Sequence, residues 1–161
     1  MKRIVFALIC LLTIAVFAAC LKTTSGYTAC SDVAVTTDSP VLIHFAADSI
    51  TPLSKDTSGL YFQILDSGSG VSPVSSSGLV LTYTAELMDQ TVFDQATNSN
   101  LQGLQLYQLI EGMQIGLKKI KKGGHIKLLI PSALAWGCAG LPPAVPSNAP
   151  VYFNVQLIDV N

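Results

Sequence analysis

Apolar and polar residues alternate along several stretches of the C-terminal two thirds of the chain. The alternation is clearest over residues 79–87, where every second side chain is apolar, and it recurs over 60–65, 125–130 and 151–158. A period of two is typical of strands that bury one face. With a short return strand expected over 91–93, the pattern predicts four or five antiparallel strands joined by polar loops.

One stretch, residues 106–117, follows a helical period instead. Apolar side chains recur three and four residues apart, at Leu109, Ile110, Met113, Leu117 and Ile120. Gly112 and Gly116 lie within this pattern, and each glycine costs a helix about 1 kcal/mol relative to alanine. Two glycines in one short helix indicate that another part of the chain lies very close to its backbone. We therefore expect an α+β domain in which a short helix lies across a curved sheet, its first turn at the rim of a cavity.

The first 19 residues have the composition of a secretion signal. Two basic residues precede an apolar segment, residues 4–17, that is too short to span a bilayer comfortably. Two alanines then precede Cys20, which resembles the lipobox of bacterial lipoproteins, although Phe17 replaces the usual leucine. We expect cleavage before Cys20 and lipidation of that cysteine. The alternative is ordinary cleavage and a free secreted protein.

Residues 20–58 are expected to form a lipid-anchored tether. The segment 21–40 is rich in Thr, Ser, Ala and Asp and shows no period. Residues 41–50 carry apolar side chains at loosely helical spacing, which predicts a short helix, and a polar linker containing a proline follows. The folded domain is expected to span residues 59–161.

Charge and cysteine content narrow the classes of function. Removing the signal's two basic residues from the nine in the chain leaves seven against ten acidic ones, a net charge of −3. A nucleic-acid-binding domain is expected to be basic, so that class is disfavoured. Cys30 and Cys138 are able to pair in an oxidising compartment, but the sequence leaves their pairing open. No cysteine has a partner at ligand spacing and His44 and His125 stand apart, so no metal or cofactor is expected.

Four segments follow one another in a recognisable order. Residues 81–94 read Leu-Thr-Tyr-Thr-Ala-Glu-Leu-Met-Asp-Gln-Thr-Val-Phe-Asp, and 109–117 read Leu-Ile-Glu-Gly-Met-Gln-Ile-Gly-Leu. Residues 123–137 end in Ile-Pro-Ser-Ala-Leu-Ala-Trp-Gly, and 146–153 read Pro-Ser-Asn-Ala-Pro-Val-Tyr-Phe. They resemble the tyrosine strand, helix start, Ile-Pro segment and closing strand of FKBP-type peptidyl-prolyl cis-trans isomerases, over roughly residues 58–161.

The resemblance implies a fold and an activity. The family folds as an antiparallel sheet of five or six strands wrapped around one short helix, in agreement with the pattern above. Its activity is cis/trans isomerisation of X-Pro bonds, which takes tens to hundreds of seconds uncatalysed. No covalent bond is made or broken, so the site needs an apolar slot for the proline ring and a few hydrogen-bond donors, without a cofactor or metal.

By resemblance, the site residues come from the four segments. The slot would be lined by Tyr83, Phe93, Ile110, Met113, Val145 and Phe153. Leu109 and Ile110 would lie at the helix start, with the Ile110 amide open to a substrate carbonyl, and Asp94 would order polar neighbours at the wall. Ala144 and Leu141 would belong to a long loop over the site. For the aromatic residues, plain burial in the core is the alternative.

Two residues depart from the family pattern. Met113 stands where the family usually has a tryptophan, and a flexible methionine does not define a flat floor for the proline ring. Trp136 stands where a tyrosine usually donates a hydrogen bond to the substrate, and its indole N–H is a donor on a larger ring. We therefore expect reduced isomerase activity.

The expected function is a prolyl isomerase that assists the folding of exported proteins. The alternative is a non-catalytic module or chaperone that holds proline-containing segments on the same fold. An inert structural lipoprotein is disfavoured because the pocket residues are retained. The tether, the short helix and the lipobox together resemble lipoproteins of Bacteroidetes-type bacteria. The resemblance implies the cell envelope of a Gram-negative-type bacterium, with the chain anchored to a membrane through Cys20 and facing the periplasm. We also expect a monomer.

Overall fold

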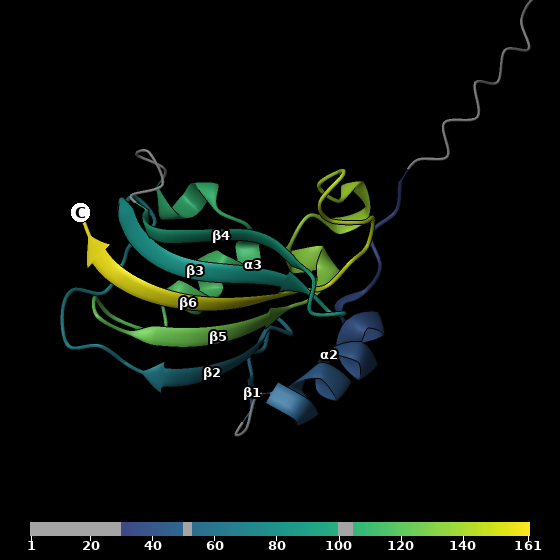
Figure 1. Ribbon diagram of the computed structural model, residues 1–161, viewed down its shortest axis with the longest axis horizontal. Coiled ribbons are helices and arrows are strands. Elements are labelled where there is room, and N and C mark those ends of the chain that lie inside the picture. Colours follow the sequence, from purple (N-terminus) through teal and green to yellow (C-terminus); the bar gives the residue numbers. More distant parts are fainter. Residues whose placement is uncertain (1–29, 50–52, 100–104) are drawn as a thin grey trace, which may run out of the picture.

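The computed structural model describes residues 30–49, 53–99 and 105–161, which form a twisted six-stranded antiparallel sheet and two α-helices (Figure 1). The sheet order is β1-β2-β5-β6-β3-β4. The strands are β1 (Ser54–Lys55), β2 (Tyr61–Asp66), β3 (Leu79–Leu87), β4 (Val92–Ser99), β5 (His125–Ile130) and β6 (Val151–Val160). The helices are α2 (Val35–Ser49) and α3 (Glu111–Leu117), with 3-10 turns η2 (Leu106–Gln108), η3 (Ser132–Leu134) and η4 (Gly137–Ala139). The expected α+β class is confirmed.

The sheet curves around α3 and buries one apolar core against it. Among the residues of this core that are at most 1% exposed are Leu81 of β3, Leu117 of α3, Leu128 and Ile130 of β5, and Val151 and Val155 of β6. They occupy alternate positions along each strand, because successive side chains of a strand point to opposite faces. The strands predicted over 79–87 and 125–130 have the bounds of β3 and β5, and the strand predicted over 151–158 extends to Val160 in β6.

Gly112 and Gly116 let α3 lie directly on β5. A Cβ atom on Gly112 would stand 2.3 Å from Cγ2 of Ile130, and one on Gly116 would stand 2.5 Å from Cδ2 of Leu128. The close approach expected from the two glycines is therefore confirmed. The helix itself is shorter than its apolar period, since η2 precedes it and the backbone is extended at Leu109 before α3 begins at Glu111.

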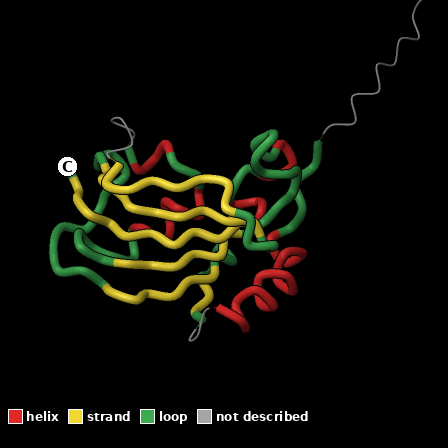
Figure 2. Tube along the Cα trace, in the orientation of Figure 1, coloured by secondary structure: helices red, strands yellow, loops and turns green. Residues whose placement is uncertain are grey.

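A second core lies on the opposite face of the sheet, beneath α2. Its buried residues are Leu42, Phe45 and Ala46 from α2 and Tyr61, Leu129 and Tyr152 from three strands. The rings of Phe45 and Tyr152 are 5.2 Å apart between centroids. Figure 2 shows α2 beside one end of the sheet and well separated from α3.

Several expectations for the N-terminal third were wrong. The expected helix forms, but it begins at Val35 instead of 41 and includes Pro40, whose missing amide leaves one helical hydrogen bond unmade. Burial of Leu42 and Phe45 against the sheet outweighs that loss. β1 forms within the expected linker by pairing with β2. The signal, Cys20 and the first part of the expected tether lie outside the described residues.

Two further differences concern polar positions. β4 runs to Ser99 although a loop was expected from Asp94, because its backbone pairs with β3 and does not need an apolar face. His125, which alternation places on the solvent side of the strand, is half-buried, with its Nε2 2.6 Å from Oδ1 of Asn154. In the lysine-rich segment, Lys119 forms an ion pair with Asp56, and Nζ of Lys122 lies 2.7 Å from Asp159.

The structure answers the question that the sequence left open about the cysteines. Cys30 and Cys138 form a disulfide with their Cα atoms 5.6 Å apart. The Pro142–Pro143 bond in the same loop region is cis. Within the described ranges, no helix has the length and apolar character needed to cross a membrane.

Candidate functional site

Four aromatic side chains from separate elements meet at one end of the main core. Phe93 of β4 stands edge-on to Trp136, with ring centroids 5.8 Å apart, and edge-on to Phe153 of β6 at 6.0 Å. The ring of Tyr83 of β3 lies 6.1 Å from that of Phe153 in a tilted arrangement. Edge-to-face pairs at these distances stabilise a fixed relative orientation of the rings. The strand register thus assembles the aromatic group that the sequence motifs indicated.

The residues around these rings fall into a buried group and a half-buried group. Met113, Val145 and Phe153 are almost fully buried, at 4%, 1% and 6% exposure. Above them, the half-buried side chains that pack against the same core are Tyr83, Phe93, Leu109, Ile110, Trp136 and Ala144. The arrangement gives a solvent-reachable apolar rim over a dry apolar floor. Leu141 is the exception, since its side chain is 44% exposed and only its backbone pairs with Val145.

The polar part of the site is one hydrogen bond between neighbouring strands. The Tyr83 hydroxyl donates to Oδ2 of Asp94 at 2.7 Å, while Asp94 itself is exposed. Burial, and then the hydrogen bond and charge of the Asp94 carboxylate, raise the pKa of Tyr83 to about 12. Tyr83 therefore stays protonated near neutral pH and acts as a fixed donor to Asp94.

The start of α3 presents a backbone donor next to the aromatic group. The Ile110 carbonyl accepts hydrogen bonds from the amides of Met113 and Gln114 at 3.0 and 3.1 Å, so it closes the first turn. Among the described residues, nothing accepts a hydrogen bond from the amide of Ile110 itself. An amide at a helix start that lacks an internal partner is available to an external acceptor.

Gln114 is a supporting residue that the sequence analysis missed. Its side-chain amide donates to the carbonyl of Leu109 at 2.7 Å and to that of Tyr107 at 3.0 Å. It thereby fixes the extended segment that leads into α3 and carries Ile110. A polar residue four positions after Ile110, within an apolar period, is the sequence signal that would have pointed to it.

Two hollows open elsewhere, beside α2. One of about 370 Å³ is lined by Pro40, Val41, His44, Phe45 and Met88. The other, of about 430 Å³, lies between α2, the turn after β3 and the loop before β6. None of the site residues expected from the sequence lines either hollow. Within the described part of the chain, no group of three His, Cys, Asp or Glu side chains could hold a metal ion.

Comparison with known proteins gives a consistent result. Residues 70–158 match the family model described as FKBP-type peptidyl-prolyl cis-trans isomerase. Over 105 residues the chain is 41% identical to FKBP-type peptidyl-prolyl cis-trans isomerase FkpA of Escherichia coli, covering 65% of this chain and 38% of that protein. A probable FKBP-type peptidyl-prolyl cis-trans isomerase of Haemophilus influenzae is 34% identical over 105 residues, which cover 65% of this chain and 44% of that protein. The chain thus spans less than half the length of these relatives.

Solved structures show the same similarity. The crystal structure of FkpA from Escherichia coli superposes with a TM-score of 0.64 and 35% identity, over 78% of this chain and 58% of that one. A peptidyl-prolyl cis-trans isomerase from Pseudomonas syringae pv. tomato superposes with a TM-score of 0.66 and 25% identity, over 81% of this chain and 98% of that one.

Proposed function

The chain belongs to the FKBP-type peptidyl-prolyl cis-trans isomerase family, and we propose that it isomerises X-Pro bonds in polypeptide clients. The observation that carries the proposal is the half-buried rim of Tyr83, Phe93, Ile110 and Trp136 above a buried apolar floor. Such a surface accepts a pyrrolidine ring by removing its apolar area from water. The residues named from the sequence motifs are proposed to bind substrate there.

The chemistry needs no base or nucleophile. Rotation about a peptide bond breaks amide resonance, with a barrier of about 18–20 kcal/mol for an ordinary peptide. The planar amide is more polar than the twisted one, so a dry apolar surround disfavours the ground state relative to the transition state. The proline ring would rest on Met113 and Phe153, and the Ile110 amide would donate to a substrate carbonyl. Asp94 would hold Tyr83 in place and does not act as a proton acceptor in the reaction.

A protease-free assay tests catalysis directly. The full chain, kept in mild detergent because of its apolar first residues, is mixed with a Leu-Pro or Phe-Pro peptide enriched in the cis isomer. The rate of approach to equilibrium is expected to exceed that of buffer with detergent alone and to scale with protein concentration. A rate equal to that of the detergent control at every concentration would reject catalysis.

We further propose that the activity is reduced because Met113 replaces a flat aromatic floor. Met113→Trp is expected to raise kcat/KM, since a rigid ring is a better-defined surface than a flexible thioether. The same change enlarges a side chain that is 4% exposed, so the free energy of unfolding should fall by about 1–3 kcal/mol. Met113→Leu, which conserves volume without adding a ring, is the control. A lower rate in the Met113→Trp chain would show that the floor is not the limiting element.

A binding module or chaperone without turnover is the second candidate, and the same buried methionine favours it. It would hold proline-containing segments on the apolar rim without twisting them. Suppression of aggregation of a proline-containing client, measured beside the isomerase assay, separates the two functions. Suppression with no isomerase activity supports the second candidate, whereas activity without suppression supports the first.

We also propose a monomer that assists folding of exported proteins from a membrane-anchored position in the cell envelope, facing the periplasm. The Cys30–Cys138 disulfide supports an oxidising compartment, because cytosolic thiols are kept reduced. Lipid on Cys20 would supply the anchor. Cells grown with a radiolabelled fatty acid are expected to label the parent protein, and Cys20→Ser should carry no label. A parent protein without label would count against lipidation.

A further inference from the structure

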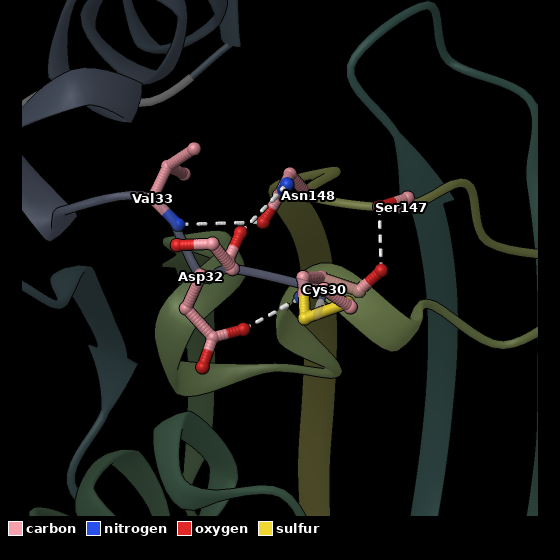
Figure 3. The surroundings of a disulfide bond; sticks show 7 residues. Cys30, Asp32, Val33, Ser147 and Asn148 are labelled. Atoms are coloured by element: carbon pink, nitrogen blue, oxygen red, sulfur yellow. Dashed lines mark hydrogen bonds between the residues drawn. A yellow bond between two sulfur atoms is a disulfide. The ribbon is translucent and has the colours of Figure 1, made fainter. Parts of the chain in front are cut away.

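The segment 30–38, called here the strap, is fastened to the loop 132–148 at several points. Figure 3 shows the disulfide between Cys30 and Cys138 with the polar contacts around it. The strap precedes the part of the chain that matches the family model, residues 70–158. The loop carries four of the candidate site residues, Trp136, Leu141, Ala144 and Val145.

The first set of contacts surrounds η4, directly after Trp136. Oδ1 of Asp32 accepts a hydrogen bond from the amide of Cys138 at 2.6 Å. Gly137 has a φ of 54°, and a Cβ there would stand 2.2 Å from the same Asp32 oxygen. A side chain at position 137 would therefore displace Asp32, so the glycine permits this contact.

The second set is made by Asn148. Asn148 accepts a hydrogen bond from the amide of Val33 and donates one to the carbonyl of Ser31, both at 3.4 Å. The amide of Asn148 also donates to the Gly137 carbonyl at 2.8 Å, which closes the loop on itself.

The third contact, between Asp38 and Ser132, is buried. Oδ2 of Asp38 accepts hydrogen bonds from both the amide and the hydroxyl of Ser132, each at 2.7 Å. Asp38 is 6% exposed and Ser132 is not exposed at all. A buried carboxylate with two donors is a strong attachment, because neither partner can turn to water instead.

We propose that the strap positions the catalytic loop, with Asp38 and Asp32 as positioning residues. They act through Ser132 and Cys138, which flank Trp136 on its two sides, and so hold the Trp136 ring edge-on to Phe93. The proposal rests on the proposed function, since it assigns the strap a role in the geometry of that same site. Loss of the strap contacts should change the environment of Trp136 and the rate of substrate turnover, whereas loss of a general stabilising contact would lower stability alone.

Trp136 makes the test specific, because it is the only tryptophan in the chain. In the full chain, Asp38→Ala and the double change Cys30→Ser with Cys138→Ser are expected to increase quenching of tryptophan fluorescence by acrylamide. Measured well below each variant's melting temperature, kcat/KM should fall about 10-fold or more, as small misplacements of site groups do. Asp38→Asn keeps an acceptor oxygen, so its acrylamide quenching and its kcat/KM are expected to lie close to the parent values.

Two comparisons keep the outcome decisive. Ile43→Ala changes a 52% exposed side chain on the same helix and should leave quenching and kcat/KM at the parent values. If Asp38→Ala does not fold, Asp32→Ala serves in its place, because it removes the oxygen that accepts from the Cys138 amide. Parent-like quenching and kcat/KM in the variants, with a lowered melting temperature, would overturn the proposal by making the strap a purely structural brace. A parent chain without isomerase activity would reject the proposed function, while the quenching of Trp136 would still decide whether the strap positions the loop.

Discussion

At the scale of single residues, Tyr83 joins the polar and apolar halves of the site. Its ring packs near Phe153 while its hydroxyl donates to Asp94, so moving one side would disturb the other. Tyr83→Phe keeps the ring and removes the donor. We expect the free energy of unfolding to fall by about 0.5–1.5 kcal/mol, the net value of one hydrogen bond. Tyr107→Phe, at a 55% exposed ring, is the control and should change stability by less than about 0.5 kcal/mol.

Alkaline pH tests the same interaction by another route. The folded-state pKa of Tyr83 is raised from 10.0 to about 12, and burial with the nearby Glu86 carboxylate raises that of Tyr152 to about 12. A tyrosine whose pKa is higher in the folded than in the unfolded state stabilises the folded protein at pH values below the unfolded-state pKa. That stabilisation is lost as the pH rises through the folded-state pKa. Denaturant unfolding should therefore show stability falling between about pH 10 and 12. The fall should be shallower in Tyr83→Phe than in the parent, and equal slopes would contradict the assignment.

At the scale of elements, the packing of α3 on β5 depends on the missing side chain at Gly116. Alanine there would improve helix propensity by about 1 kcal/mol. It would also place a Cβ 2.5 Å from Cδ2 of Leu128, a side chain that is fully buried. Overpacking of this kind costs about 1–3 kcal/mol, so Gly116→Ala is expected to destabilise the protein on balance.

A double-mutant cycle identifies the clash as the cause. In a Leu128→Ala background the obstructing atoms are gone, so Gly116→Ala should cost less than in the parent or even stabilise. Glu111→Ala, at an exposed position of the same helix, should stay within about 0.5 kcal/mol of the parent. Equal costs of Gly116→Ala in both backgrounds would rule out contact with Leu128 as the reason.

Elements with a strong hydrophobic period were predictable, and those formed by tertiary contacts were not. β3 and β6 carry apolar side chains at alternate positions because one face of each strand lines the main core. β4 carries mostly polar residues and is held by backbone hydrogen bonds to β3. Such pairing leaves no pattern of apolar residues in the sequence of β4. The first turns of α2 were missed because Pro40 breaks the helical pattern, while the burial that stabilises the helix comes from strands far along the chain.

At the scale of the whole molecule, one covalent link spans most of the described chain. Cys30 and Cys138 are separated by 108 residues, so the disulfide restricts the unfolded chain strongly. Replacing both cysteines by serine is expected to lower the free energy of unfolding by about 2–5 kcal/mol. Denaturant unfolding of the parent with and without a reducing agent gives the matched comparison, and the serine variant should not respond to the reductant.

The candidate site shows the same division between local and long-range information. The resemblance named Tyr83, Phe93 and Phe153 as neighbours in one slot, and the structure brings their rings together. The attachment of Asp38 to Ser132 could not be predicted, since it joins residues 94 apart and leaves no periodic trace in either segment. The same holds for the pairing of Cys30 with Cys138.

The disulfide also determines where the proposed lipid-anchored tether joins the folded domain. With Cys20 as the proposed lipid anchor, only ten chain steps separate the bilayer surface from Cys30, a reach of at most about 35 Å when fully extended. Cys30 is bonded to Cys138, two residues after Trp136. The segment between the lipid anchor and the disulfide therefore ends close to the rim of the candidate site. Clients would then be met close to the lipid headgroups, within reach of chains that have only just crossed the membrane.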